Sequence, residues 1–168
     1  MDVFFFEAFE EEARLMKKYL GSGVKAGFTN LTIQEYGAEN PPAEVISTRV
    51  QSVIPPGWAS QLKAIHSRST GFEHLQRYIK NTGSKAACGY LPLYCHRAVA
   101  EQALLLWMAL LRKLPRQARQ FENFNRDGIT GFECEGKTLL VVGVGNIGYQ
   151  IVKIGKGMGM NVLCVDLE

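Results

Sequence analysis

The sequence predicts an α/β protein, with one complete parallel-sheet domain followed by the start of a second. Two observations predict this class. Over residues 1–89, short apolar runs alternate with segments in which apolar residues recur at helical spacing. Residues 136–168 repeat the alternation, with a glycine-rich turn between strand and helix. Strands that alternate with helices form parallel sheets with helices on both faces.

Short apolar runs supply the strands of the first domain. They are rich in β-branched, aromatic and small residues and are bounded by turn signals. These runs are Val3–Phe6, Val24–Phe28, Ala43–Thr48, Ala64–Ser67 and Ser84–Gly89.

Helices are predicted between these strands. Apolar spacing indicates helices at Glu7–Leu20 and Phe72–Lys80, both followed by glycine. A proline pair precedes a short helix near Trp58–Leu62, whereas Asn30–Tyr36 is ambiguous. The order of elements predicts a flavodoxin-like domain over residues 1–96.

The segment His96–Leu114 is apolar on nearly all sides. A helix of this kind is expected to be buried between two bodies of protein. Pro115 ends its regular course, and Arg116–Asp127 is a polar helix or loop. We therefore assign residues 97–168 to an interdomain helix and the first βαβ unit of a nucleotide-binding domain.

The second domain is organised around a G-x-G-x-x-G turn. The apolar run Thr138–Val142 leads directly into Gly143-Val144-Gly145-Asn146-Ile147-Gly148, and a helical pattern follows. A second run, Asn161–Val165, ends at Asp166. Strand, glycine turn, helix, strand and acid in this order are typical of a Rossmann dinucleotide site.

Each residue type of this turn has a physical reason. Gly143 permits the sharp turn, Gly145 lets the backbone approach a pyrophosphate, and Gly148 lets the helix sit close to the sheet. The helix N-terminus offers N–H groups to phosphates. Asp166 would accept the ribose hydroxyls and repel a 2′-phosphate, which favours NAD over NADP. The alternative is a glycine turn of another doubly wound protein that binds no ligand or a mononucleotide.

Composition excludes several classes of protein. The net charge of +3 and the absence of basic clusters interleaved with aromatic residues argue against a nucleic-acid partner. No apolar run has membrane-spanning length, and acidic residues flank the aromatic residues of the opening segment, unlike a signal peptide. Cysteines without C-x-x-C spacing are expected to be reduced thiols, with no metal site, in a cytoplasmic protein. They are Cys88, Cys95, Cys134 and Cys164.

Three stretches together resemble the D-isomer-specific 2-hydroxyacid dehydrogenases, most closely the D-lactate dehydrogenase branch. They are HSRSTGFEHL at 66–75, YLPLYCHRAVAEQALLL at 90–106 and ENFNRDGITGFECEGKTLLVVGVGNIG at 122–148. The resemblance implies an N-terminal substrate domain and an NAD domain. It also implies hydride transfer between nicotinamide C4 and C2 of a 2-oxoacid, and a homodimer formed through the 97–114 helix region.

The resemblance also assigns residues. The backbone of Thr70 and Gly71 would hold the substrate carboxylate, Tyr94 would line the substrate pocket, and Val99 would pack on the nicotinamide ring. Each also has a structural interpretation: a plain strand-to-helix turn, a half-buried aromatic residue and a core residue, respectively. The cofactor residues implied are Gly143, Gly145, Asn146, Ile147, Gly148 and Asp166.

The family's catalytic Arg, Glu and His lie beyond the equivalent of Glu168, so the resemblance implies no catalytic residue in these 168 residues. We expect His66, His74 and His96 to be structural. His96-Arg97 stands where relatives often carry Ser-Pro, so the pocket edge near Tyr94 is expected to differ.

Two hypotheses from different classes remain. In the first, the chain is the N-terminal half of an NAD-dependent D-2-hydroxyacid dehydrogenase. In the second, it is a short, catalytically inactive nucleotide-binding or dimerisation module. A third possibility keeps the scaffold but changes the substrate to a larger 2-oxoacid or phosphite, because Tyr94 and Phe72 indicate an apolar pocket.

Overall fold

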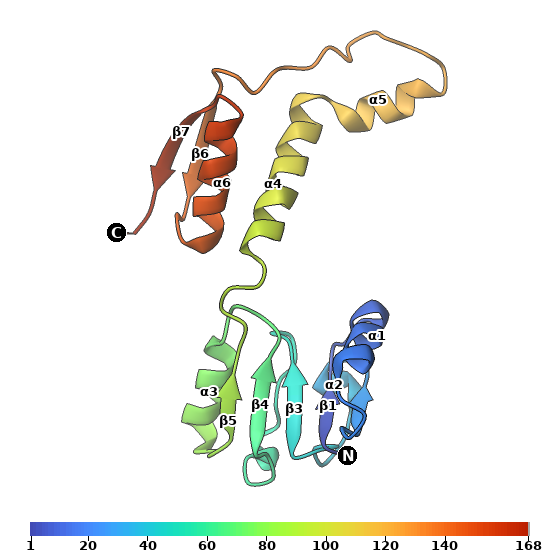
Figure 1. Ribbon diagram of the computed structural model, residues 1–168, viewed down its shortest axis with the longest axis vertical. Coiled ribbons are helices and arrows are strands. Elements are labelled where there is room, and N and C mark those ends of the chain that lie inside the picture. The colour runs from blue at the N-terminus through green and yellow to red at the C-terminus, as the bar shows by residue number, and fades with distance from the viewer. Residues whose placement is uncertain (168) are drawn as a thin grey trace. The chain divides into compact units, whose positions relative to one another are not determined.

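The computed structural model describes residues 1–167 (Figure 1). Its internal contacts divide the chain into two compact units, Met1–Pro92 and Leu93–Glu168. Each unit is an α/β structure with parallel strands, so the predicted fold class is confirmed.

The first unit contains a five-stranded sheet in the order β2-β1-β3-β4-β5, and every pairing is parallel (Figure 1). The strand order reverses between β1 and β3, as in flavodoxin-like domains. The strands are β1 Val3–Phe5, β2 Ala26–Phe28, β3 Val45–Thr48, β4 Ala64–Ser67 and β5 Ala87–Gly89.

Helices cover both faces of this sheet: α1 Glu10–Tyr19, α2 Ile33–Tyr36, the 3₁₀ helix η1 Pro56–Trp58, and α3 Glu73–Thr82. The ambiguous segment 30–36 forms α2 because Thr32 and Glu35 make a capping box. The short helix predicted near Trp58–Leu62 begins earlier, at Pro56, because proline favours the first turn of a helix.

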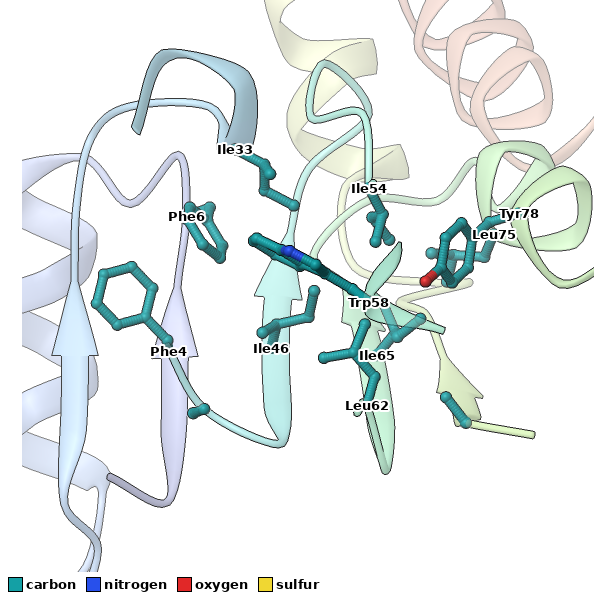
Figure 2. Packing of buried hydrophobic residues seen from close by; sticks show 12 residues of the cluster. Phe4, Phe6, Ile33, Ile46, Ile54, Trp58, Leu62, Ile65, Leu75 and Tyr78 are labelled. Carbon is teal, nitrogen blue, oxygen red and sulfur yellow. The ribbon is translucent and has the colours of Figure 1, made fainter. Parts of the chain in front are cut away.

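The core lies on one face of the sheet, under α2, η1 and α3 (Figure 2). Trp58 is fully buried there among side chains of β1, β3 and β4, and its indole N–H donates to the carbonyl of Glu39 at 2.9 Å. Phe5 points to the opposite face and stacks on Phe28, with ring centroids 4.9 Å apart. Lys17 of α1 lies over the Phe28 ring, so α1 covers this second face.

The second unit contains α4 His96–Leu111, α5 Leu114–Phe121, β6 Thr138–Val142, α6 Asn146–Gly157 and β7 Asn161–Val165. Strands β6 and β7 pair in parallel, and α6 contacts both strands and α4 (Figure 1). The strand–helix–strand unit predicted around the glycine turn is therefore present.

The helix beginning at His96 was expected to be buried between two bodies of protein, but within the described chain much of its surface is exposed. Helix α6 covers one side of α4, and Ala100 is its one fully buried residue within residues 1–167. Leu105, Leu106 and Leu110 are exposed by 54%, 56% and 76%. The apolar composition was read correctly, but a single helix partner cannot cover the whole circumference of α4.

Candidate functional site

The glycine turn connects β6 to α6. Gly143 has φ 85°, a left-handed conformation that favours glycine, and its N–H donates to the carbonyl of Val165 at 2.7 Å. Gly145 is the N-cap of α6, and no side chain caps the helix there. A Cβ on Gly145 would meet no atom within 4 Å. The turn therefore presents open backbone beside the first N–H groups of a helix of 12 residues, starting at Asn146 and Ile147.

Gly148 packs directly on this turn. A Cβ at Gly148 would overlap the carbonyl oxygen of Gly143 and lie 2.9 Å from its carbonyl carbon. Because both atoms belong to the backbone, a side chain here would require the turn or the helix to move. Gly148 thus has the close-packing role that the third glycine of such turns requires.

Asp166 follows β7 and reaches back to the glycine turn. Its Oδ2 accepts the N–H of Val144 at 2.6 Å, and its Oδ1 accepts the N–H of Leu167 at 2.8 Å. The hydrogen bond from Val144, followed by that from Leu167, lowers the pKa of the Asp166 carboxyl. An exposed, ionised carboxylate therefore stands beside the turn predicted to bind a pyrophosphate.

Thr70 and Gly71 lie between β4 and α3, at the carboxyl edge of the first sheet. The hydroxyl of Ser69 donates to the carbonyl of Gly71 at 2.9 Å, and the Ser69 carbonyl accepts the N–H of Leu91 at 3.1 Å. These two bonds hold the backbone of the turn in place. Thr70 is exposed, and Gly71 is partly buried.

Tyr94 and Val99 belong to the second unit. Tyr94 precedes α4 and is 54% exposed, and Val99 lies in the first turn of α4 and is 42% exposed. Neither side chain is part of the core of its own unit. The described chain thus leaves both side chains accessible.

The histidines lie in regular structure. His66 is in β4, 3.4 Å from the hydroxyl of Ser47, and burial, then the charge of Arg68, lowers its pKa. His74 is in the first turn of α3, and its pKa is lowered chiefly by burial. Both imidazoles therefore favour the neutral form in the fold. His96 is the first residue of α4.

A cluster of ion pairs at the carboxyl edge of the first sheet was missed in the sequence. Arg68 is 5% exposed, and its guanidinium donates to Glu12 at 2.8 Å and to the carbonyl of Phe6 at 2.7 Å. Arg49 also contacts Glu12, at 3.1 Å. Burial alone would raise the pKa of Glu12, but the two arginines outweigh it and lower that pKa.

Glu7 is a further charged residue at the carboxyl edge of the first sheet. Its φ is 53°, and its carboxylate accepts the N–H groups of Arg49 at 2.9 Å and Ser52 at 3.2 Å. One signal was available in the sequence, because Glu7, Arg49 and Arg68 each stand within two residues of the end of an apolar strand run. Charged residues at the carboxyl ends of parallel strands meet at one edge.

Other kinds of site have no support in residues 1–167. These residues contain no group of three or more His, Cys, Asp or Glu side chains placed to hold a metal ion. Within the same range no helix is long and apolar enough to cross a membrane. The four cysteines are free, as predicted.

The glycine turn, its helix and Asp166 define a dinucleotide-binding α/β protein. Residues 104–168 match the family described as "D-isomer specific 2-hydroxyacid dehydrogenase, NAD binding domain". The D-lactate dehydrogenase of Escherichia coli is 38% identical over 108 residues, covering 62% of this chain and 32% of that protein. A 2-hydroxyacid dehydrogenase homolog of Haemophilus influenzae is 41% identical over 78 residues, covering 45% and 24%, respectively.

Solved structures agree with these sequence matches. The apo-structure of the Escherichia coli D-lactate dehydrogenase has a TM-score of 0.82 at 26% identity, covering 100% of this chain and 56% of that one. The Aquifex aeolicus D-lactate dehydrogenase complexed with NAD and lactic acid has a TM-score of 0.78 at 28% identity, covering 99% and 52%. These sequence and structure matches support the D-isomer specific 2-hydroxyacid dehydrogenase family, which the motifs predicted. The chain spans about half the length of these solved chains.

Proposed function

We propose that this protein is an NAD-dependent D-2-hydroxyacid dehydrogenase of the D-lactate dehydrogenase type. It would transfer a hydride between the nicotinamide and a 2-oxoacid or D-2-hydroxyacid. The observation that carries the proposal is the open glycine turn with Asp166 bound to the Val144 N–H, inside a segment that matches an NAD binding domain. The D-lactate dehydrogenases among its relatives support the substrate class.

The residues present fit NAD. Open space at Gly145 and uncapped N–H groups at the start of α6 suit a pyrophosphate, and the Asp166 carboxylate suits a ribose diol without a 2′-phosphate. The bound nicotinamide would supply the hydride. The residues proposed to bind the cofactor are Val99, Gly143, Gly145, Asn146, Ile147, Gly148 and Asp166.

On the substrate side, we propose residues 1–96 as the substrate domain and 97–168 as part of the NAD domain. The backbone of Thr70 and Gly71 would bind the carboxylate of the 2-oxoacid, with Ser69 fixing the turn through the Gly71 carbonyl. Tyr94 would contact the substrate. None of the three histidines is assigned the proton transfer, because none stands at the position of the family's catalytic histidine.

A second candidate is a catalytically inactive nucleotide-binding or dimerisation module. The exposed leucines of α4 favour pairing of two copies through the 97–114 region, and such pairing is equally compatible with a dehydrogenase. We also propose the cytoplasm as the compartment, because the four cysteines are free thiols.

Steady-state reduction of 2-oxoacids by the protein as its source produces it tests the proposal, with NADH absorbance as the readout. We expect NADH-dependent reduction that Gly145→Val abolishes, because a branched side chain would occupy the space of the pyrophosphate. Gly21→Val is the matched control, since Gly21 also has open space but lies in the other unit. NADH binding without any reduction would instead favour the inactive module.

A further inference from the structure

Arg49 occupies the position in the first sheet where open α/β sheets bind ligands. The strand order reverses between β1 and β3, and Arg49 directly follows β3 at the carboxyl edge. Ligands of such sheets bind outside the carboxyl ends of the strands at the point of reversal. The side chain of Arg49 therefore stands at the edge that also carries the proposed substrate turn.

The guanidinium of Arg49 is only partly used by the protein. Its Nη2 lies 3.1 Å from Glu12, while its Nε is buried without a hydrogen-bond partner. The Arg49 side chain is 31% exposed and lies over the ring of Phe9, 5.5 Å from the centroid. Part of the Arg49 side chain is thus open to solvent and rests against an aromatic ring, whereas its unpartnered Nε is buried.

Arg68 differs from Arg49 in each of these respects. It is 5% exposed, and it donates to Glu12, to the hydroxyl of Ser47 and to two backbone carbonyls. Both arginines share the same oxygen of Glu12. The carboxylate of Glu7 is bound by backbone N–H groups. Arg68 is therefore structural, and one shared carboxylate leaves Arg49 able to attract another anion.

Arg49 follows the strand next to the one that leads into the proposed substrate turn. Thr48 pairs with Ser67, and the ladder continues with the N–H of Arg68 donating to the Thr48 carbonyl at 2.8 Å. Arg49 is thus beside Arg68. In the chain, Arg68 precedes Thr70 by two residues. The segments that contain Arg49 and lead into the Thr70–Gly71 turn are therefore neighbours at the carboxyl edge of the sheet.

We propose that Arg49 binds a second carboxylate of the substrate, so that the preferred 2-oxoacid is a dicarboxylate. This inference rests on the proposed function. The Thr70–Gly71 turn holds the carboxylate next to the 2-oxo carbon, and Arg49 pairs with the carboxylate at the other end. Arginine suits this role because its planar fork binds a carboxylate through two parallel hydrogen bonds.

Specificity ratios test the proposal in the protein as its source produces it. The value of kcat/KM is compared for oxaloacetate against 2-oxobutyrate and for 2-oxoglutarate against 2-oxovalerate, which are pairs of equal carbon number. We expect at least one dicarboxylate to be favoured about tenfold or more, and Arg49→Gln to lower that ratio by about 10- to 100-fold. Arg49→Lys should give an intermediate ratio, because it keeps the charge without the fork.

Arg14→Gln is the matched control, because Arg14 is an exposed cation of α1 in the same unit. The specificity ratio of this variant should equal that of the wild type. A wild-type preference for the monocarboxylate substrates, or an unchanged ratio in Arg49→Gln, would overturn the role of Arg49 and leave the dehydrogenase function standing. Absence of reduction for every 2-oxoacid would overturn both.

Discussion

Asp166 has one task in the structure and a second that is proposed. Its carboxylate fastens β7 to the glycine turn through the Val144 N–H, and its exposed face is proposed to bind the adenosine ribose. The first task needs only an acceptor oxygen, whereas discrimination against a 2′-phosphate needs the negative charge. A substitution that keeps the acceptor but removes the charge therefore tests the second task alone.

We expect Asp166→Asn to bring the dissociation constants of NADH and NADPH closer together, because the repulsion of the 2′-phosphate is lost. Asp166→Ala should also raise the dissociation constant of NADH by about tenfold or more, as expected for lost hydrogen bonds to a charged group. Fluorescence titration with both nucleotides measures these constants, and Asp127→Ala serves as the control at an exposed acid elsewhere in the unit. Unchanged cofactor preference in both Asp166 variants would remove Asp166 from the ribose site.

Gly148 and Gly157 lie on the same helix and have opposite surroundings. A Cβ at Gly148 would overlap the backbone of Gly143, whereas at Gly157 it would meet nothing within 4 Å. Gly148→Ala should therefore lower the free energy of unfolding of its unit by about 3 kcal/mol. Gly157→Ala should leave it unchanged or raise it by up to about 1 kcal/mol. Urea denaturation of the two variants in parallel measures the difference, and equal stabilities would contradict the packing described.

Among the helices, α4 carries apolar residues that one copy of the described chain does not cover. Its apolar residues exceed what α6 covers, and three leucines remain more than half exposed. Contiguous apolar surface of this kind marks a site of association. A second copy of the chain is the occupant proposed above.

We expect Leu106→Glu to convert the proposed homodimer to a monomer, because a charge would be buried at the centre of the proposed interface. Light scattering coupled to size exclusion measures the mass of the particle. Tyr19→Glu is the control, since Tyr19 is 76% exposed on α1, outside the 97–114 region. If both variants kept the wild-type mass, the helix would not be the dimer contact.

Sequence periodicity was sufficient to predict most helices and strands, because each strand run is short, β-rich and bounded by turn residues. Strands β4, β6 and β7 have the predicted bounds. The capping box of Thr32 and Glu35 was present as a local signal that would have resolved α2. The partners of Glu12 were not predictable in the same way, because Arg49 and Arg68 lie 37 and 56 residues away and meet it only through the strand order.

For the molecule as a whole, the sequence motifs identified the family, and the structure explains why the glycine turn fits a dinucleotide. The positions of the predicted site residues could be inferred from the bounds of their elements. The residues of the glycine turn lie between a predicted strand and a predicted helix, and Thr70–Gly71 lie just after the end of β4. The exposure of Tyr94 and Val99 did not follow from composition, since apolar residues next to a long apolar helix resemble core residues.

Transfer of a labelled hydride from NADH to a 2-oxoacid is the most direct test of the proposed dehydrogenase activity. The protein as its source produces it is incubated with NADH carrying deuterium at both hydrogen positions of nicotinamide C4 and with its best 2-oxoacid. We expect a 2-hydroxyacid of D configuration with deuterium at C2. A product of L configuration, or a reduced product without the label, would contradict the proposed activity.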